Sequence, residues 1–329
     1  MRKLLHLFFL LCFGSLMAQN TGVSIALVGD RAPDTELARS YENNLKEEIL
    51  LLLQHRYTVA FKTYYLSTDL AEVAKVFDDA YAENDIVVAM GTVGTNYTIA
   101  LKNFPQPTIG SIVLDAQLQG LNKTPEGTSG ISNFTYMESP FDMERDLNLL
   151  YTIYPFTHLE VMTEEASIGD QAFFKQLFEN YLQGKNVSVD VIFYNEDIRE
   201  HFKEKRSEKV AIYALPYFGR DSTLLNNFFQ VINENKVPSS ALFGEAYIAA
   251  GALSGHETID NLQKIPRRIA LTIMKILEGQ APADLSVEVQ TFSDNLLINM
   301  ETARQIGIYP NFDLMSEATL INLEKIQTD

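Results

Sequence analysis

The sequence is poor in the residues that stabilise small secreted domains or carry thiol and metal chemistry. It has one cysteine, Cys12, no tryptophan and five histidines among 329 residues. Because Cys12 falls in an N-terminal segment that we expect to be removed, the mature chain would have no disulfide, thiol nucleophile or cysteine-based metal site. None of the histidines has an HxH or HExxH spacing. We therefore expect no metal site and no cofactor.

Positive charge is also scarce. Lysine and arginine number 26 against 43 aspartates and glutamates, which gives a formal net charge of −17. Nucleic acids and anionic membrane surfaces attract basic proteins, so this balance argues against both as partners. The chain also lacks a GxSxG nucleophile motif. These absences predict a protein without catalytic residues.

Only one long apolar run is present, and it lies at the N-terminus. Arg2 and Lys3 precede the apolar stretch 4–17, which is followed by Ala18 and Gln19. This is the pattern of a cleaved signal peptide, which we assign to residues 1–18. The run is shorter than the roughly 20 residues that a membrane-spanning helix needs. Cys12 lies within the run without the small preceding residues that lipid attachment requires, so a lipoprotein is disfavoured.

The rest of the chain alternates between strand-like and helix-like segments in two series. The first series has strands at 23–28, 57–65, 85–90, 107–113 and 130–133, with helices at 36–53, 70–81 and 94–102. The second has strands at 158–162, 187–194, 209–214, 240–243 and 249–254, with helices at 141–151, 171–183, 197–205, 222–235 and 267–277. Such alternation predicts an α/β fold of two doubly wound parallel-sheet lobes.

The C-terminal third carries the most specific pattern. It reads VPSSALFGEAYIAAGALSGHETIDNLQKIPRRIALTIMKILEGQAPADLSVEVQTFSDNLLINMETARQIGIYP over residues 237–310. This ordered stretch resembles the substrate-binding proteins of ABC importers, of the two-lobed periplasmic binding protein type 1. It is most similar to the branch with amino-acid-binding, often aromatic-amino-acid-binding, members. The segment after Pro310 goes beyond the usual end of that family and predicts an extra helix.

This resemblance implies an architecture and a set of partners. It implies a hinge, an interlobe ligand cleft, and lobes that are discontinuous in sequence. Since the late helix follows a return crossover in the family, we expect lobe one to hold 22–133 plus 256–283 and lobe two to hold 134–255 plus 284–329. The expected protein is a monomer in the periplasm of a Gram-negative cell. Its partners would be a small-molecule ligand and an ABC permease in the inner membrane.

The function that follows is solute capture without chemistry. The protein would bind a small polar ligand, an amino acid being favoured, between its lobes and deliver it to the importer. One alternative is an import-uncoupled sensor or accessory component of another cell-envelope complex. An enzyme on the same fold is a remote alternative.

Ligands of parallel sheets bind outside the carboxyl ends of the strands, which selects the candidate site residues. These are Asp30, Thr92, Thr95, Asp115, Ser132, Glu164, Tyr217 and Glu245. The turn 91–95 (GTVGT) would open a helix whose free N–H groups favour a ligand carboxylate. Three blander readings stay open: a helix-capping threonine in that turn, a turn-forming Asp115 and a solvated Glu245. We expect His256 to be a solvated loop residue.

Overall fold

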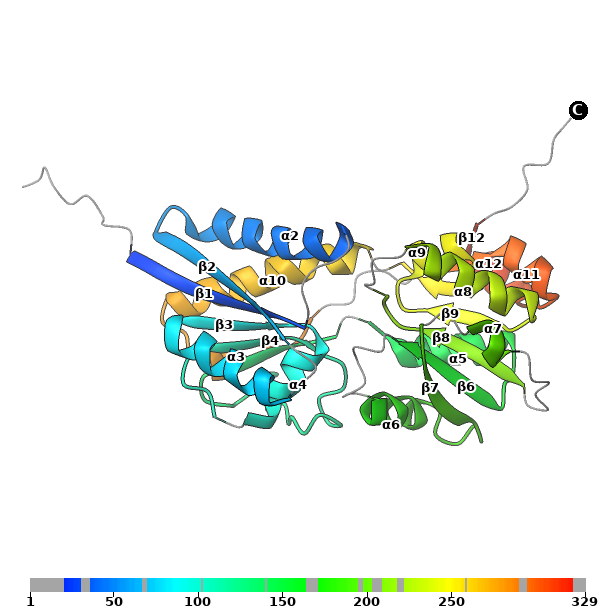
Figure 1. Ribbon diagram of the computed structural model, residues 1–329, viewed down its shortest axis with the longest axis horizontal. Coiled ribbons are helices and arrows are strands. Elements are labelled where there is room, and N and C mark those ends of the chain that lie inside the picture. Colours follow the sequence, from blue (N-terminus) through cyan, green and yellow to red (C-terminus); the bar gives the residue numbers. More distant parts are fainter. Residues whose placement is uncertain are drawn as a thin grey trace, which may run out of the picture.

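The computed structural model shows two lobes side by side (Figure 1). The residues that it describes are 21–30, 36–66, 70–101, 103–139, 141–163, 171–194, 198–202, 209–217, 222–257, 259–289 and 295–321. The predicted signal peptide therefore lies outside the described residues. No helix in the described ranges is long and apolar enough to cross a bilayer.

The first lobe is built on a five-stranded parallel sheet with the order β2-β1-β3-β4-β5. Its strands are β1 (Thr21–Gly29), β2 (Tyr57–Tyr65), β3 (Ile86–Met90), β4 (Thr108–Val113) and β5 (Phe134–Glu138). Its helices are α2 (Glu36–Leu53), α3 (Leu70–Glu83), α4 (Thr92–Leu101) and α10 (Ile259–Leu277). Every residue of β3 is buried, as expected for a strand whose sheet is covered on both faces.

The second lobe is built on a seven-stranded sheet with the order β12-β11-β10-β9-β8-β6-β7. Its strands are β6 (His158–Thr163), β7 (Ser188–Phe193), β8 (Val210–Ala214), β9 (Ser239–Ala241), β10 (Ser254–His256), β11 (Leu296–Asn299) and β12 (Thr319–Ile321). Its helices are α5 (Met143–Ile153), α6 (Gln171–Tyr181), α7 (Ile198–His201), α8 (Ser222–Glu234), α9 (Gly244–Ala250), α11 (Met300–Ile306) and α12 (Phe312–Glu317). Its strands pair in parallel except that β10 and β11 run antiparallel.

Helix α10 belongs to the first lobe although the second lobe precedes it in sequence. Ile265, Ile269 and Ile273 recur at helical spacing and pack with Ile25 and Leu45 in one buried cluster. The opposite face of the sheet is covered by α3 through a separate cluster. Figure 1 shows α10 beside α2 on one side of the first sheet. The chain therefore returns to lobe one after building most of lobe two.

Three segments carry the chain between the lobes, and they are hydrogen-bonded to one another. Glu138 N, at the end of β5, donates to Val287 O at 3.0 Å. Glu257 N donates to Asn295 O at 3.1 Å, and the Asn295 amide donates to the Glu257 carboxylate at 2.8 Å. The crossovers therefore pass from one lobe to the other as a bundled set.

Two details of the expected organisation need correction. The fifth strand of lobe one is β5 at Phe134–Glu138, so this lobe continues past the predicted boundary at residue 133. The segment expected as a strand at 249–254 begins as helix α9, which ends at Gly251 with φ 118°. Its sequence GEAYIAA is rich in alanine, the best helix former, and glycine accepts the left-handed conformation that ends a helix.

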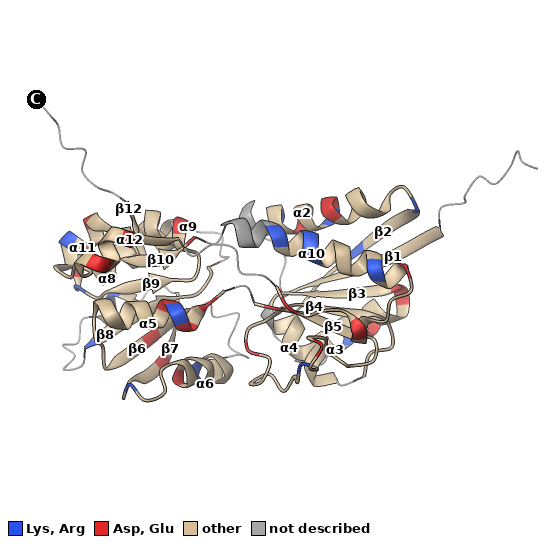
Figure 2. Ribbon diagram, turned by 180° about the vertical axis from the view of Figure 1, so that it is seen from behind, with Lys and Arg blue, Asp and Glu red and all other residues tan. Residues whose placement is uncertain are grey.

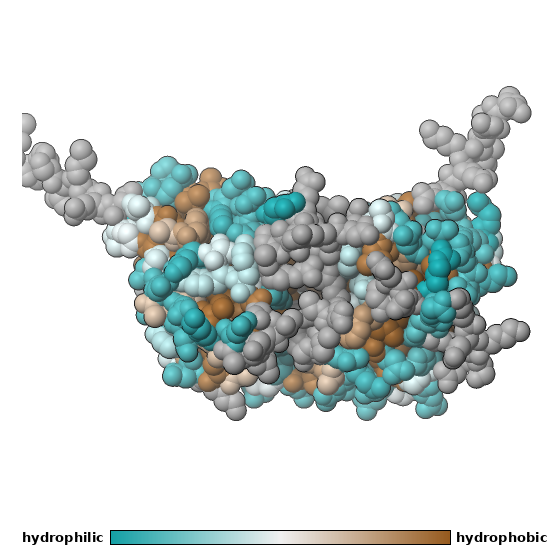
Figure 3. Space-filling view, viewed as in Figure 1, coloured by the Kyte–Doolittle hydropathy of each residue, from teal (hydrophilic) through white to brown (hydrophobic). Residues whose placement is uncertain are grey.

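Acidic residues outnumber basic ones in the sequence and occur in both lobes. Figure 2 shows acidic segments where the chain passes between the lobes as well as on the outer helices. Figure 3 shows apolar residues as separate small patches among hydrophilic ones on the visible face. Among the described residues, the most exposed large apolar side chain is Phe312, at 78%.

Candidate functional site at the junction between the lobes

The loops that follow strands in both sheets meet at the junction between the lobes. Leu114 and Leu118, which follow β4 in lobe one, pack against the core cluster of lobe two. Phe243 follows β9 in lobe two, and its ring lies 6.0 Å from that of Phe141 in the first crossover. The geometry thus brings the carboxyl ends of both sheets to one place, where parallel sheets bind ligands. We call this region the junction.

Asp30 lies at the end of β1 and caps helix α4. Its carboxylate accepts hydrogen bonds from Val93 N at 3.1 Å and Gly94 N at 2.8 Å. The preceding Gly91 N donates to Ser111 Oγ at 3.1 Å. These N–H groups are the ones that the sequence suggested for a ligand carboxylate. In the structure they are held by side chains of the protein itself.

Thr92 and Thr95 belong to the same turn, but the structure describes the side chain of Thr95 only. Thr92 is the first residue of α4, but its side chain is outside the described part of the structure. Thr95 is fully buried, and its hydroxyl lies 3.4 Å from Ala89 O inside the lobe. Its methyl group faces Gly110 in β4. Thr95 is therefore described as a packing residue, and its burial does not favour the predicted ligand contact.

Asp115 forms a turn after β4. Leu118 N donates to Asp115 Oδ1 at 2.8 Å, and Asp115 N donates to Gln119 Oε1 at 3.0 Å. The Gln119 amide also contacts Asn96 Oδ1, which ties this turn to α4. These hydrogen bonds agree with the alternative in which Asp115 forms a turn. Its ligand contact stays a prediction, because the side chain is partly exposed at the junction.

Ser132 does not lie at the junction. The strand expected at 130–133 is β5 at 134–138, so Ser132 precedes the strand instead of following it. At the other end of the sheet, the carbonyl of its neighbour Asn133 accepts a hydrogen bond from Thr108 N at 2.8 Å. The error arose from placing the strand several residues too early. Glu164, a further candidate, lies outside the described residues.

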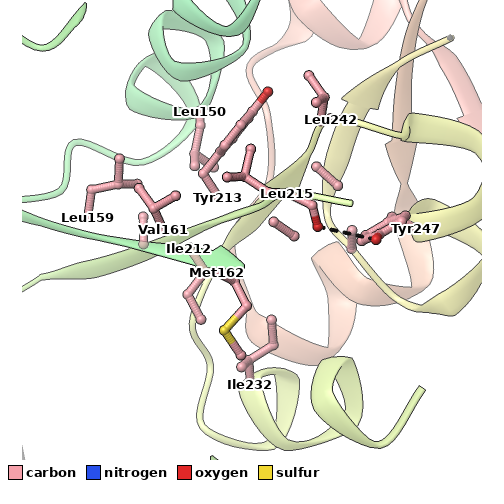
Figure 4. Close-up of a cluster of buried hydrophobic side chains, with 14 of the residues drawn as sticks. Leu150, Leu159, Val161, Met162, Ile212, Tyr213, Leu215, Ile232, Leu242 and Tyr247 are labelled. Carbon is pink, nitrogen blue, oxygen red and sulfur yellow. Dashed lines mark hydrogen bonds between the residues drawn. The ribbon is translucent and has the colours of Figure 1, made fainter. Parts of the chain in front are cut away.

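Tyr217 lies at the junction on the lobe-two side, after β8. Its N–H donates to the Tyr247 hydroxyl at 2.5 Å, and that hydroxyl donates to Leu215 O at 3.2 Å (Figure 4). The Tyr217 ring lies 5.2 Å from that of Tyr194, whose hydroxyl also donates to Leu215 O, at 2.9 Å. Two tyrosines thus fix the loop that presents Tyr217. Its own ring is partly exposed, and its ligand contact stays a prediction.

Further aromatic rings extend this wall. The ring of Phe243 lies between Phe141 and Tyr247, at centroid distances of 6.0 Å and 6.3 Å. Glu245 stands in the first turn of α9 directly after Phe243, and is partly exposed. We call Phe141, Tyr194, Tyr217, Phe243 and Tyr247 the aromatic wall. The sequence analysis found only Tyr217 of this set, because aromatic residues after strands also serve as ordinary core.

A buried polar group braces lobe two next to the crossovers. His256 Nδ1 lies 2.6 Å from Asp146 Oδ1, and the Tyr213 hydroxyl donates to Asp146 Oδ2 at 2.8 Å. His256 is the last residue of β10 and is 6% exposed, so the expectation of a solvated loop histidine is wrong. Asp146 lies in α5, just after the first crossover. The contact therefore links the elements that border two of the crossovers.

Carboxylates from both lobes surround one phenol at the junction. Burial raises the pKa of the Tyr181 hydroxyl, and Asp115, Glu144 and Asp142 raise this pKa further through their negative charge. Asp115 belongs to lobe one, whereas the other two border the start of α5 in lobe two. Negative charge from both lobes therefore lies near this phenol. In the described residues, no three histidine, cysteine, aspartate or glutamate side chains are arranged to hold a metal ion.

No protein-family model and no curated protein matches the chain. Solved structures do. The ABC domain in complex with L-Trp from Streptococcus pneumoniae matches with a TM-score of 0.63 and 18% identity over 90% of this chain and 99% of that chain. A conserved domain protein from Vibrio cholerae matches with a TM-score of 0.66 and 18% identity over 91% of this chain and 99% of that one.

An ABC sugar transporter subunit from Rhodobacter sphaeroides matches with a TM-score of 0.54 and 10% identity, over 84% of this chain and 98% of that one. At such identities the likeness shows the fold alone. The fold is the two-lobed periplasmic-binding-protein type 1 fold, and the predicted fold class is confirmed. The three structures carry different names, so their likeness to this chain does not itself identify a ligand.

Proposed function

We propose that this protein is an extracytoplasmic solute-binding protein that captures a small polar ligand at the junction and delivers it to an ABC importer. The observation that carries the proposal is the meeting of both sheets' carboxyl ends at one junction, between lobes joined by three bundled crossovers. Such a pair of edges can enclose a ligand when the lobes rotate about the crossovers. A hinge at the crossovers and an interlobe cleft are part of this proposal.

The two edges would contribute different interactions. In the aromatic wall, the partly exposed ring of Tyr217, held in place by the buried Tyr194 and Tyr247, would stack on a flat or apolar ligand group. The loops of lobe one offer short polar side chains held by hydrogen bonds. An amino acid with an aromatic or extended side chain remains the favoured ligand. The L-Trp of the Streptococcus neighbour supports this choice, and the name of the Rhodobacter neighbour keeps sugars in the test panel.

No bond-breaking step belongs to the proposal. The buried His256–Asp146–Tyr213 group has the residue types of a proton relay, but each member is less than a tenth exposed and bonded within the lobe. A catalytic base has to reach its substrate within hydrogen-bond distance. We therefore assign these residues a structural role and propose that the protein is not an enzyme.

A thermal-shift panel of amino acids, small peptides and sugars tests the proposed function. At least one member should raise the melting temperature, because a ligand that binds only the folded state stabilises it. Calorimetry of Tyr217→Ala should then show affinity for that member reduced at least about tenfold. Tyr309→Ala is the matched control, since Tyr309 is 53% exposed and does not belong to the aromatic wall. A panel without any binder, or equal losses in both variants, would count against the proposal.

A sensor or accessory role is the second candidate. The observation that favours it is the C-terminal addition, in which β12 extends the sheet beside β11 and Phe312 of α12 is 78% exposed. Uptake of the identified ligand should fall when the gene is deleted if the protein serves an importer. Unchanged uptake, with ligand binding intact in vitro, would favour the sensor or accessory role.

A further inference from the structure

The start of α4 is already occupied by a carboxylate. A helix N-terminus carries unpaired N–H groups and the positive end of the helix dipole, and it therefore attracts anions. Here both oxygens of Asp30 accept from this turn, one from Val93 N at 3.1 Å and the other from Gly94 N at 2.8 Å. This bidentate contact uses the Val93 and Gly94 N–H groups, which are the donors that a ligand carboxylate would need.

The Asp30 carboxylate lies where side chains on the two glycines of the turn would have to be. Gly91 has φ +94°, and a Cβ at this position would overlap the Asp30 carboxylate. A Cβ at Gly94 would lie 3.4 Å from Asp30 Oδ1. The GTVGT turn therefore has the backbone of an anion-binding loop, but the anion that it accommodates is part of the chain.

Other carboxylates also lie at the junction. Asp115, Asp142 and Glu144 all act on the Tyr181 hydroxyl, which places negative charge from both lobes around one junction residue. Negative charge near a site raises the free energy of a bound anion and lowers that of a bound cation. The electrostatics thus agree with the occupied helix end.

We propose that Asp30 is a specificity-determining residue of the proposed ligand site. Its carboxylate takes the place at α4 that a ligand carboxylate would fill, so the site selects a ligand that needs no carboxylate there. The chemical class is a small amine, because the negative charge of Asp30 attracts a cation and repels a carboxylate. This inference rests on the proposed function, and it replaces the favoured amino acid with an amine that lacks the carboxyl group.

Matched pairs of probes test the ligand class. Tyrosine and tyramine, arginine and agmatine, and tryptophan and tryptamine each differ only by the carboxyl group. Calorimetry on the full mature protein should show the amine binding about tenfold or more tightly in at least one pair. Asp30→Asn, which removes the charge but keeps an acceptor, should abolish that preference. Tighter binding of the amino acid, a preference that Asp30→Asn leaves unchanged, or no binding by any of the six probes would overturn the proposed class.

A second experiment needs no ligand and tests directly whether Asp30 fills an anion site at the N-terminus of α4. Asp30→Ala should expose the Val93 and Gly94 N–H groups to sulfate. Melting temperature is compared in sodium sulfate and in sodium chloride of equal ionic strength, with Asp85→Ala as the control. Asp85 is a carboxylate in the same lobe that accepts from Ser24 N at 2.7 Å and does not contact α4. Asp30→Ala should gain about 2–4 °C more from sulfate than the wild type or Asp85→Ala.

Equal sulfate shifts in all three proteins would overturn the idea that Asp30 fills an anion site. Should Asp30→Ala not fold, Asp30→Ser replaces it, because the shorter serine side chain carries no charge and lacks the second oxygen with which Asp30 accepts from both N–H groups. A sulfate effect confined to the Asp30 variant, with no binder in the wider ligand panel, would instead locate the failure in the proposed function.

Discussion

The two lobes place different types of side chain at the junction. Lobe one presents Asp30 and Asp115 on turns whose backbone donors they bond themselves. Lobe two presents the aromatic wall, which two tyrosine hydroxyls attach to the carbonyl of Leu215. A polar edge that is already internally bonded has little capacity for further hydrogen bonds, whereas the partly exposed ring of Tyr217 can stack on a ligand without a free hydrogen-bond partner. For the proposed function, we therefore expect lobe two to supply most of the binding energy and lobe one most of the selectivity.

The largest expected effect concerns stability next to the crossovers. Asp146→Ala should lower the free energy of unfolding by about 3 kcal/mol, because it leaves buried His256 and Tyr213 without their shared acceptor. Chemical denaturation measures the loss. Asp190→Ala is the control, since the Asp190 side chain is 61% exposed. Equal effects of the two substitutions would show that the buried group does not brace lobe two.

The fit between Gly91 and Asp30 should appear as energetic coupling. Gly91→Ala should cost about 2 kcal/mol in the wild-type background, because an alanine has to adopt positive φ and its Cβ overlaps Asp30. The cost should fall in the Asp30→Ala background, where the clash is gone. Gly120→Ala provides the comparison, with φ +76° and open space around its Cβ position. Strictly additive costs in the double-mutant cycle would contradict the proposed fit.

Tyr247→Phe should weaken the aromatic wall without breaking the fold. It removes the hydroxyl that accepts from Tyr217 N and donates to Leu215 O. The unfolding free energy should fall by about 1 kcal/mol, and ligand affinity should fall as the Tyr217 loop loses its position. Calorimetry with the identified ligand measures the affinity. An unchanged affinity would separate this loop from the binding site.

The smallest expected effect is a pH dependence in lobe one. Burial raises the pKa of Glu42, but hydrogen bonds from Lys46, Tyr65 and Thr63 outweigh it, and the net pKa lies below the ordinary 4.5. A depressed pKa in the folded state stabilises the fold above the unfolded-state value, and this contribution disappears as the pH falls through the folded-state value. Glu42→Gln should therefore be less sensitive than the wild type to acidification in this range. Parallel unfolding curves at each pH would contradict this assignment.

The sequence predicted the fold well because its signals were periodic. The apolar spacing of α2 and the apolar runs of β1 and β3 specified their elements closely. It failed where short segments lacked a period, as at 130–133 and 249–254. The site was harder to predict. A position after a strand indicates the correct edge of a sheet, but the burial of Thr95 and the docking of Asp30 onto α4 depend on contacts between distant segments.

Hydrogen-exchange mass spectrometry tests the central claim, that one ligand is held by both lobes at the junction, most directly. With the ligand from the thermal-shift panel at saturation, the account predicts slower amide exchange at 113–118 in lobe one together with 215–217 and 243–247 in lobe two. The crossover residues Glu138 and Glu257 should also gain protection if the lobes close about them. Protection confined to one lobe, or to the α12–β12 end, would contradict the claim.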